Sequence, residues 1–177
     1  MHARGRIGVV VLVALPFVAL VGCGGVDAVD PAASPTATPT LPTATPVLVD
    51  VGDPEAYAAD LFAATNAARA AEELPELPPS DCAAEHALER AEKLVGLEGL
   101  AHAPLEGVIA DCAPATGAAE NLVRSAAAPE AVVQAWLDSP GHRANLLSAD
   151  YAVAAITCVP DGEELVCSHV FLNAEVP

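Results

Sequence analysis

The stretch "AWLDSPGHRANLL", residues 135–147, gathers residue types that are scarce elsewhere in the chain. It holds the only Trp, Trp136, together with His142, one of five His, and Arg143, one of seven basic residues. Ser139 followed by Pro140 is typical of a helix start, because Ser accepts a hydrogen bond at the N-cap and Pro suits the first helical position. His142 then becomes the third helical residue, beside unpaired N–H groups and the positive helix end. We therefore predict a neutral His142 whose lone pair is free for a metal, a water or a carboxylate.

Residues 1–22 are typical of a signal peptide, with a short basic start and the apolar run "IGVVVLVALPFVALVG". The run ends in "LVGC", residues 20–23, which resembles the lipobox of bacterial lipoproteins, where the chain is cut before the Cys and the thiol is acylated. The alternative is an ordinary secretory signal with an incidental Cys. We expect an exported protein that Cys23 anchors to the cell membrane by its acyl chains, facing the extracellular side or the periplasm.

The charge and composition after Cys23 argue against several partners. The chain has a formal net charge of −17, so nucleic acid is excluded as a natural ligand and anionic lipid head groups are not attracted to the folded part. Residues 26–46 are rich in Pro, Thr and Ala, with few large apolar residues to bury. We interpret residues 23–50 as the acylated Cys and a disordered spacer, and residues 51–177 as one domain.

The four remaining cysteines form an even set, as expected for disulfides in an exported protein. Cys158 and Cys167 lie at equal distances from the Pro-Asp-Gly turn of "VPDGEELV", so they would face each other across an antiparallel hairpin. The pair Cys82 and Cys112 follows by elimination.

Hydrophobic spacing predicts helices first and a hairpin last. A helix capped by Asp53 is expected over residues 54–73, a second from about Ser80 to the glycines of "VGLEGL", and a third over residues 129–137. The second helix should pack through one apolar face, composed of Ala84, Leu88, Ala91 and Val95. Strands are expected over residues 153–159 and 165–172. This order favours an α+β fold in which helices cover a sheet.

Four short motifs in this order resemble the CAP superfamily of cysteine-rich secretory, antigen 5 and pathogenesis-related proteins, in its bacterial SCP-like branch. They are "NAAR" (66–69), "LAH" (100–102), "AEN" (119–121) and "W…SPGHRANLL" (136–147). The resemblance covers residues 57–173 and implies a three-layer α-β-α sandwich with a central antiparallel sheet. It also implies a cleft lined by His and Glu side chains, in which some members bind a divalent metal.

Residue by residue, the resemblance assigns His102, Glu120 and His142 to this cleft, as ligand-contacting residues and as the ligands of a weakly bound metal such as zinc. Two departures from the family pattern make the site incomplete: Ala119 replaces the usual Gly, and Ser139 stands where many members have a second Glu. We therefore expect no required cofactor and, at best, micromolar metal binding.

Each residue also has a structural interpretation. Trp136 is expected in the core, Glu120 could hold loop amides together with Asn121, and His142 could be an inert helix cap. The remaining family positions, Asn66, Arg69 and Ser139, are interpreted as structural. His86 is expected on a solvated helix face, and His169 is expected to face solvent or pair locally.

Three functions are compatible with these residues. The first is a non-enzymatic, monomeric binding module for a small apolar ligand or a cell-wall component, because members of the superfamily bind sterols and other lipids. The second is a structural or adhesive surface domain with a vestigial cleft. The third, which we disfavour, is a metal-dependent hydrolase: the chain has no Gly-x-Ser-x-Gly elbow and no reactive Cys once four are paired.

Overall fold

The computed structural model describes residues 52–174. The predicted signal peptide, the lipidation site Cys23 and the spacer lie outside the described residues. Within the described part, none of the helices combines the length and the apolar character needed to span a membrane.

Five helices and three strands make up the described domain. The helices are α1 (Pro54–Ala71), α2 (Asp81–Glu92), α3 (Glu106–Asp111), α4 (Pro129–Asp138) and α5 (Pro140–Leu146). The strands are β1 (Ala118–Ser125), β2 (Val153–Asp161) and β3 (Glu164–Leu172). Two of the helix starts use side-chain caps that the sequence indicated: Asp53 accepts a hydrogen bond from the N–H of Ala56, and Ser80 accepts one from that of Ala83.

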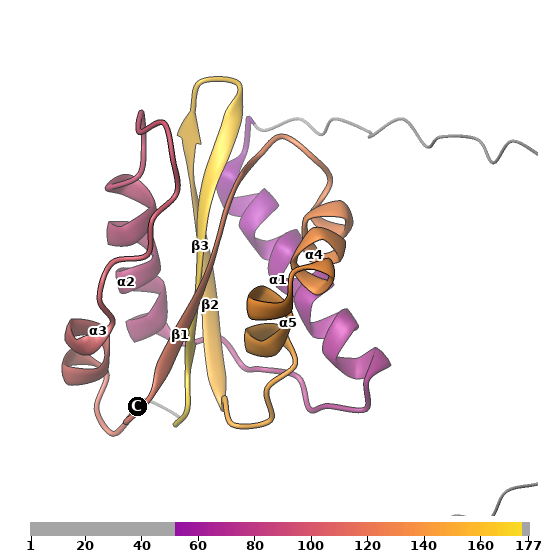
Figure 1. Cartoon of the computed structure of the whole chain (residues 1–177), viewed down its shortest axis with the longest axis vertical. Helices are drawn as coiled ribbons and strands as arrows, with labels where there is room; N and C mark the ends of the chain where they lie inside the picture. Colours follow the sequence, from indigo (N-terminus) through magenta and orange to yellow (C-terminus); the bar gives the residue numbers. More distant parts are fainter. Residues whose placement is uncertain (1–51, 175–177) are drawn as a thin grey trace, which may run out of the picture. The chain divides into compact units, whose positions relative to one another are not determined.

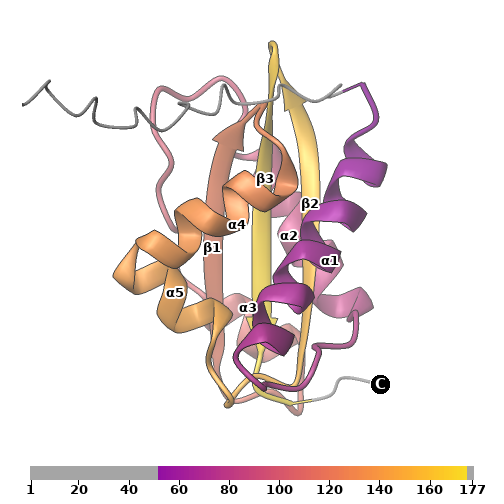
Figure 2. The same ribbon diagram turned by 90° about the vertical axis from the view of Figure 1, so that its right-hand side faces the viewer.

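The strands form an antiparallel sheet in the order β1-β3-β2, with helices on both faces. Figure 1 shows α2 and α3 on one side of the sheet and α1, α4 and α5 on the other, and Figure 2 shows α1 and α4 lying over the strands. This is the predicted α+β arrangement with a central antiparallel sheet between two helical layers.

The β2–β3 hairpin has the predicted register. Cys158 lies opposite Cys167, and both the Cys158–Cys167 and the Cys82–Cys112 disulfides are present. Asp161 pairs with Glu164, and Gly162 between them has a φ of 67°, a left-handed conformation that glycine adopts without strain. The second disulfide joins α2 to the residue that ends α3.

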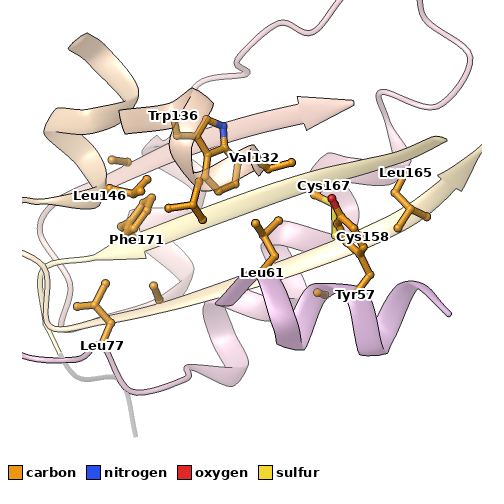
Figure 3. Packing of buried hydrophobic residues seen from close by; sticks show 14 residues of the cluster. Tyr57, Leu61, Leu77, Val132, Trp136, Leu146, Cys158, Leu165, Cys167 and Phe171 are labelled. Atoms are coloured by element: carbon orange, nitrogen blue, oxygen red, sulfur yellow. A yellow bond between two sulfur atoms is a disulfide. The ribbon is translucent and has the colours of Figure 1, made fainter. Parts of the chain in front are cut away.

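The larger core cluster fills the space between the sheet and the layer of α1, α4 and α5. Trp136, Leu61, Leu146 and Phe171 are among its buried members, and Figure 3 shows them between the helices and β3. A second cluster lies on the opposite face, where α2 contributes the small side chains of Ala83 and Ala87.

The predicted packing face of α2 is half right, since Ala91 is buried and Ala84 half-buried, but its two large members are not. Leu88 and Val95 are 41% and 42% exposed, whereas Ala83, Ala87 and Ala91 are fully buried. Alanines at every fourth position allow the helix backbone to approach the sheet closely, so small size rather than apolar bulk marks the buried face. The same face carries Arg90, which is only 8% exposed.

Two elements were not predicted at all. The strand β1 contains Glu120, Asn121 and Arg124 and therefore lacks the alternation of apolar and polar residues on which strand prediction depends. The helix α3 has only six residues, less than two turns.

The predictions for two histidines were wrong as well. His86 is half-buried and lies 3.4 Å from Asp111, measured from Nε2 to Oδ2. His169 is fully buried, with its ring against Phe62, Trp136 and Phe171. It lies on β3, the middle strand of the sheet, where helices cover both faces and every residue after Glu164 is buried.

The buried His169 predicts a loss of stability in acid. Its ring nitrogens have no hydrogen-bond partner among residues 52–174, and burial, followed by the charge of Arg69, lowers its pKa well below 6.5. The unfolded chain therefore binds a proton that the folded chain does not, and the contribution of His169 to the free energy of unfolding is lost as the pH falls below 6.5. We expect His169→Leu to flatten this fall by about 1.4 kcal/mol per pH unit. Urea denaturation of both proteins across this range measures the slope, and parallel curves would contradict the prediction.

Candidate functional site

Trp136, near the end of α4, supports the turn between α4 and α5 from the core side. Its indole Nε1 donates a hydrogen bond to the carbonyl oxygen of Leu122 on β1 at 3.2 Å, and its side chain is only 3% exposed. Ser139 stands at the N-cap of α5, as predicted, but its side chain makes no capping bond; its carbonyl oxygen accepts from the N–H of Arg143. The burial of Trp136 and its hydrogen bond to Leu122 confirm that this residue belongs to the core.

Two asparagines tie α5 to β1. The Nδ2 of Asn121 donates to the carbonyl oxygen of His142 at 3.1 Å. Asn145 donates from its own Nδ2 to the side-chain oxygen of Asn121 at 2.9 Å and to the carbonyl oxygen of Glu120 at 3.3 Å. These bonds hold the backbone of His142 against the strand that carries Glu120.

Glu120 is the centre of the site, and its carboxylate is fully paired. Arg90 donates from Nε to Oε1 at 2.6 Å and from Nη2 to Oε2 at 2.8 Å, a bidentate ion pair. Ser168 on β3 donates to Oε1 at 2.7 Å, and the Nδ1 of His102 lies 2.8 Å from Oε2. Burial raises the pKa of Glu120, but the hydrogen bonds from Arg90, His102 and Ser168 outweigh it, so the net pKa is lowered and Glu120 stays ionised.

His102 and His142 form the exposed side of the site. The side chain of His102 is 53% exposed on the loop between α2 and α3, whereas His142 is half-buried. Burial lowers the pKa of His142, and the electrostatic influence of the nearby His102 lowers it further. The neutral state predicted for His142 is thus favoured, although burial rather than the helix end is the main cause. The structure pairs His102 with Glu120 directly. It binds only the backbone carbonyl of His142, through Asn121, and no hydrogen bond among residues 52–174 joins the His142 ring to the other two side chains.

Arg90 is the functional residue that sequence reasoning missed. Besides Glu120, it donates to the carbonyl oxygens of Ala103 and Pro104, at 2.8 and 3.2 Å, and so positions the loop that carries His102. The available signal was its rarity: the chain has only seven basic residues, and this one stands beside Ala91 and three residues after Ala87. In a helix that spacing places it next to the small buried face.

Asn66 and Arg69 have the structural role expected of them. The side chain of Asn66 exchanges two hydrogen bonds with the backbone of Leu77, at 2.9 and 3.1 Å. The fully buried Arg69 donates to the carbonyl oxygens of Pro75, Leu146 and Ser148, which fixes the loop after α1 and the end of α5.

The three cleft residues fit a divalent metal poorly. Three residues already make four hydrogen bonds to the carboxylate of Glu120, and the guanidinium of Arg90 places a positive charge where a cation would bind. Among residues 52–174, the group of three potential ligand residues whose ligand atoms all lie within 4.8 Å of one another is Cys82, His86 and Cys112, and these two cysteines are joined in a disulfide. Two imidazoles alone form a weak zinc site, since structural and catalytic sites use three or four protein ligands.

Weak zinc binding, predicted through His102, Glu120 and His142, stays a prediction, and the paired carboxylate of Glu120 leaves the two imidazoles as its main ligands. We expect heat from zinc titration of the wild type only at micromolar concentrations or above, less heat as the pH falls because protons compete for the imidazoles, and none for His142→Ala. Stability should change little in that variant, because His142 is a half-buried cleft residue rather than part of either core cluster. Isothermal titration at two pH values measures the first effect and urea denaturation the second. No heat for the wild type at either pH would contradict the site.

The described residues form an α-β-α sandwich in which His102 pairs with Glu120, and Asn121 and Asn145 hold the helix of His142 against the same strand. The sequence matches the cysteine-rich secretory protein family, CAP, over residues 62–171, and the chain belongs to this family. No curated protein matches the sequence.

Solved structures show the same fold. A cysteine-rich secretory protein from Staphylococcus aureus is 19% identical, with a TM-score of 0.61 over 70% of this chain and 40% of its own. An extracellular protein containing an SCP domain from Bacillus anthracis is 21% identical, with a TM-score of 0.58 over 67% of this chain and 41% of its own. An outer surface protein of Borrelia burgdorferi is 19% identical, with a TM-score of 0.62 over 74% of this chain and all of its own. The chain thus matches about two fifths of the first two proteins, and the likeness concerns the fold.

Proposed function

We propose that this protein is an exported, lipid-anchored CAP domain that binds a small apolar ligand or a cell-wall component without catalysing a reaction. The observation that carries this proposal is the saturated carboxylate of Glu120. A general base needs a free lone pair within reach of the proton that it removes, and a hydrolytic metal needs an open coordination set. Glu120 offers neither a free lone pair nor an open metal-ligand position while its carboxylate is hydrogen-bonded to Arg90, Ser168 and His102.

A cavity beside the site supports the binding function. It has a volume of about 340 Å³ and lies between α2, α3 and the loop that carries His102, with Arg90 and Glu120 at its side. Its apolar lining comes from Leu94, Ala101, Ala103, Pro104 and Val108. This volume is at the lower end of the range for small-molecule sites, about 300–1,000 Å³, which favours a short apolar group over a whole sterol.

The cavity can be tested by filling it. A Cβ built on Gly107 in α3 meets no atom within 4 Å, so Gly107→Phe can occupy the cavity without strain at its own backbone. We expect n-octanol to shift the amide NMR signals of Ala101, Ala103 and Val108 in the wild type but not in Gly107→Phe, with Gly141→Phe as a control outside the cavity, at a position that also has room for a side chain. Isolated peptidoglycan in a sedimentation assay tests the wall-component alternative. Failure of both probes to bind would favour the structural or adhesive function.

The hydrolase alternative has its own test. His102→Ala and His142→Ala should leave any hydrolysis of casein or of p-nitrophenyl acetate at the level of the wild type, because we expect that level to be background. A clear loss in both variants would overturn the non-enzymatic proposal.

Export is supported by two observations, whereas anchoring rests on the likeness of residues 20–23 to a lipobox. Two disulfides within one small domain are typical of oxidising compartments, and the Bacillus and Borrelia proteins with this fold are described as extracellular and outer surface proteins. We predict that Cys23→Ala releases the protein from membranes or blocks its processing. Fractionation and mass measurement of the variant check this, and unchanged membrane association with normal processing would contradict it.

A further inference from the structure

The sheet has an edge that the described residues leave largely open. The strand β2 is the outer strand next to β3, and its outer side is paired at one residue only within residues 52–174. There, Ala154 donates to the carbonyl oxygen of Pro78 and accepts from the N–H of Ser80, both at 3.1 Å.

The next two outward-facing residues of β2, Ile156 and Cys158, have no main-chain hydrogen-bond partner on that side among residues 52–174. Main-chain groups alternate in direction along a strand, so the N–H and C=O groups of Ile156 and Cys158 point away from β3, as those of Ala154 do. No hydrogen bond to these four groups is formed by residues 52–174. A row of unpaired strand groups is a template for one more strand.

This edge forms the floor of a groove of about 660 Å³. One wall is the first half of α1 and the other is the start of α2, which lie on opposite sides of the sheet in Figure 1. The apolar residues Ala58, Phe62, Ala84 and Ile156 line the groove, together with Thr157 and Cys158. The groove is separate from the cavity beside Glu120, with which it shares no lining residue.

The rim of the groove is negative. Asp53, Glu55 and Asp81 are all exposed there, and no Lys, Arg or His lines it. The starts of α1 and α2 also face the groove, and each contributes about half a positive charge, so three carboxylates outweigh them. A second copy of a chain with net charge −17 would be repelled from this rim.

We propose that this edge of β2 binds an extended, basic peptide segment of a partner protein as a fourth strand. Main-chain hydrogen bonds to Ile156 and Cys158 would hold the segment in place, and alternate side chains would contact Phe62 or the carboxylates. The site does not depend on the proposed cleft function.

The test uses the full chain with acetyl-Lys-Val-Thr-Val-Lys-amide and its Glu-for-Lys counterpart, followed by amide hydrogen exchange. The Lys peptide should slow the exchange of the Ile156 and Cys158 amides at least tenfold, and the Glu peptide should not. Two N-methylated peptides complete this comparison, one methylated at the odd residues and the other at the even residues. Their affinities should differ at least tenfold, because only one edge of the peptide faces β2. Equal binding of the two N-methylated peptides would overturn strand addition.

Variants of the rim and the edge complete the test. Glu55→Lys with Asp81→Lys should reverse the preference between the Lys and Glu peptides. Ile156→Pro removes one outward donor and should weaken binding at least tenfold, and the charge variants decide the question if this variant does not fold. Protection of both amides without peptide would overturn the proposal, and sedimentation velocity then assigns the edge either to a second copy or to residues 43–51 of the same chain.

Discussion

Replacing Trp136 by Ala is expected to lower the free energy of unfolding by about 3–5 kcal/mol. The indole is 3% exposed, its ring lies 5.8 Å from that of His169, and its Nε1 pairs with Leu122. Truncation leaves a cavity between α4 and the sheet and a buried carbonyl without its donor, and both effects destabilise the folded state.

Urea denaturation followed by circular dichroism measures this loss, since the variant has no Trp for fluorescence. Leu88→Ala is the matched control: it removes a large apolar side chain that is 41% exposed on α2 and should change the free energy of unfolding by no more than about 0.5 kcal/mol. A Trp136→Ala protein within 1 kcal/mol of the wild type would mean that the turn before α5 does not depend on the indole, contrary to about 3–5 kcal/mol expected here.

Local chemistry explains which parts of the fold could be predicted. Helix starts depend on one or two adjacent residues, so Asp53 with Pro54 and Ser80 could be identified from their neighbours. The hairpin depends on a turn and on two cysteines at equal distances from it, which fixed the register of Cys158 and Cys167.

Three of the failures, at His169, Arg90 and β1, have a common physical cause: the burial of polar groups depends on distant partners. His169 and Arg90 are polar residue types that usually face water, and their burial depends on residues far away in the chain: Trp136 for the first and Glu120 for the second. The strand β1 was missed because the burial of its Glu120 and Asn121 depends on Arg90 and Asn145 in the same way. The family motifs located Glu120, but they gave no indication that an Arg would pair with it.

The ion pair between Arg90 and Glu120 predicts the second large effect on stability. Arg90→Met should lower the free energy of unfolding by about 3–5 kcal/mol, because it leaves the carboxylate of Glu120, whose side chain is 2% exposed, buried without its main counter-charge. Glu120→Gln is the matched variant, and the double variant should lose less than the two single losses combined, since neither charge then remains unpaired.

The pH dependence distinguishes lost charge pairing from lost packing. In the wild type, hydrogen bonds from Arg90, His102 and Ser168 outweigh burial and lower the pKa of Glu120 below 4.5, so its stabilising contribution is lost only as the pH falls through that lowered pKa. Without Arg90, burial dominates and raises this pKa, so protonation on acidification relieves the unpaired charge. The difference in unfolding free energy between wild type and Arg90→Met should therefore shrink from neutral pH to about pH 4, where most ordinary carboxyls begin to titrate. Urea denaturation of the four proteins of the cycle at both pH values measures the difference. If it stays constant with pH, Arg90 supports the loop at Ala103 and Pro104 through packing alone, and the saturated carboxylate no longer explains why this cleft would bind rather than catalyse.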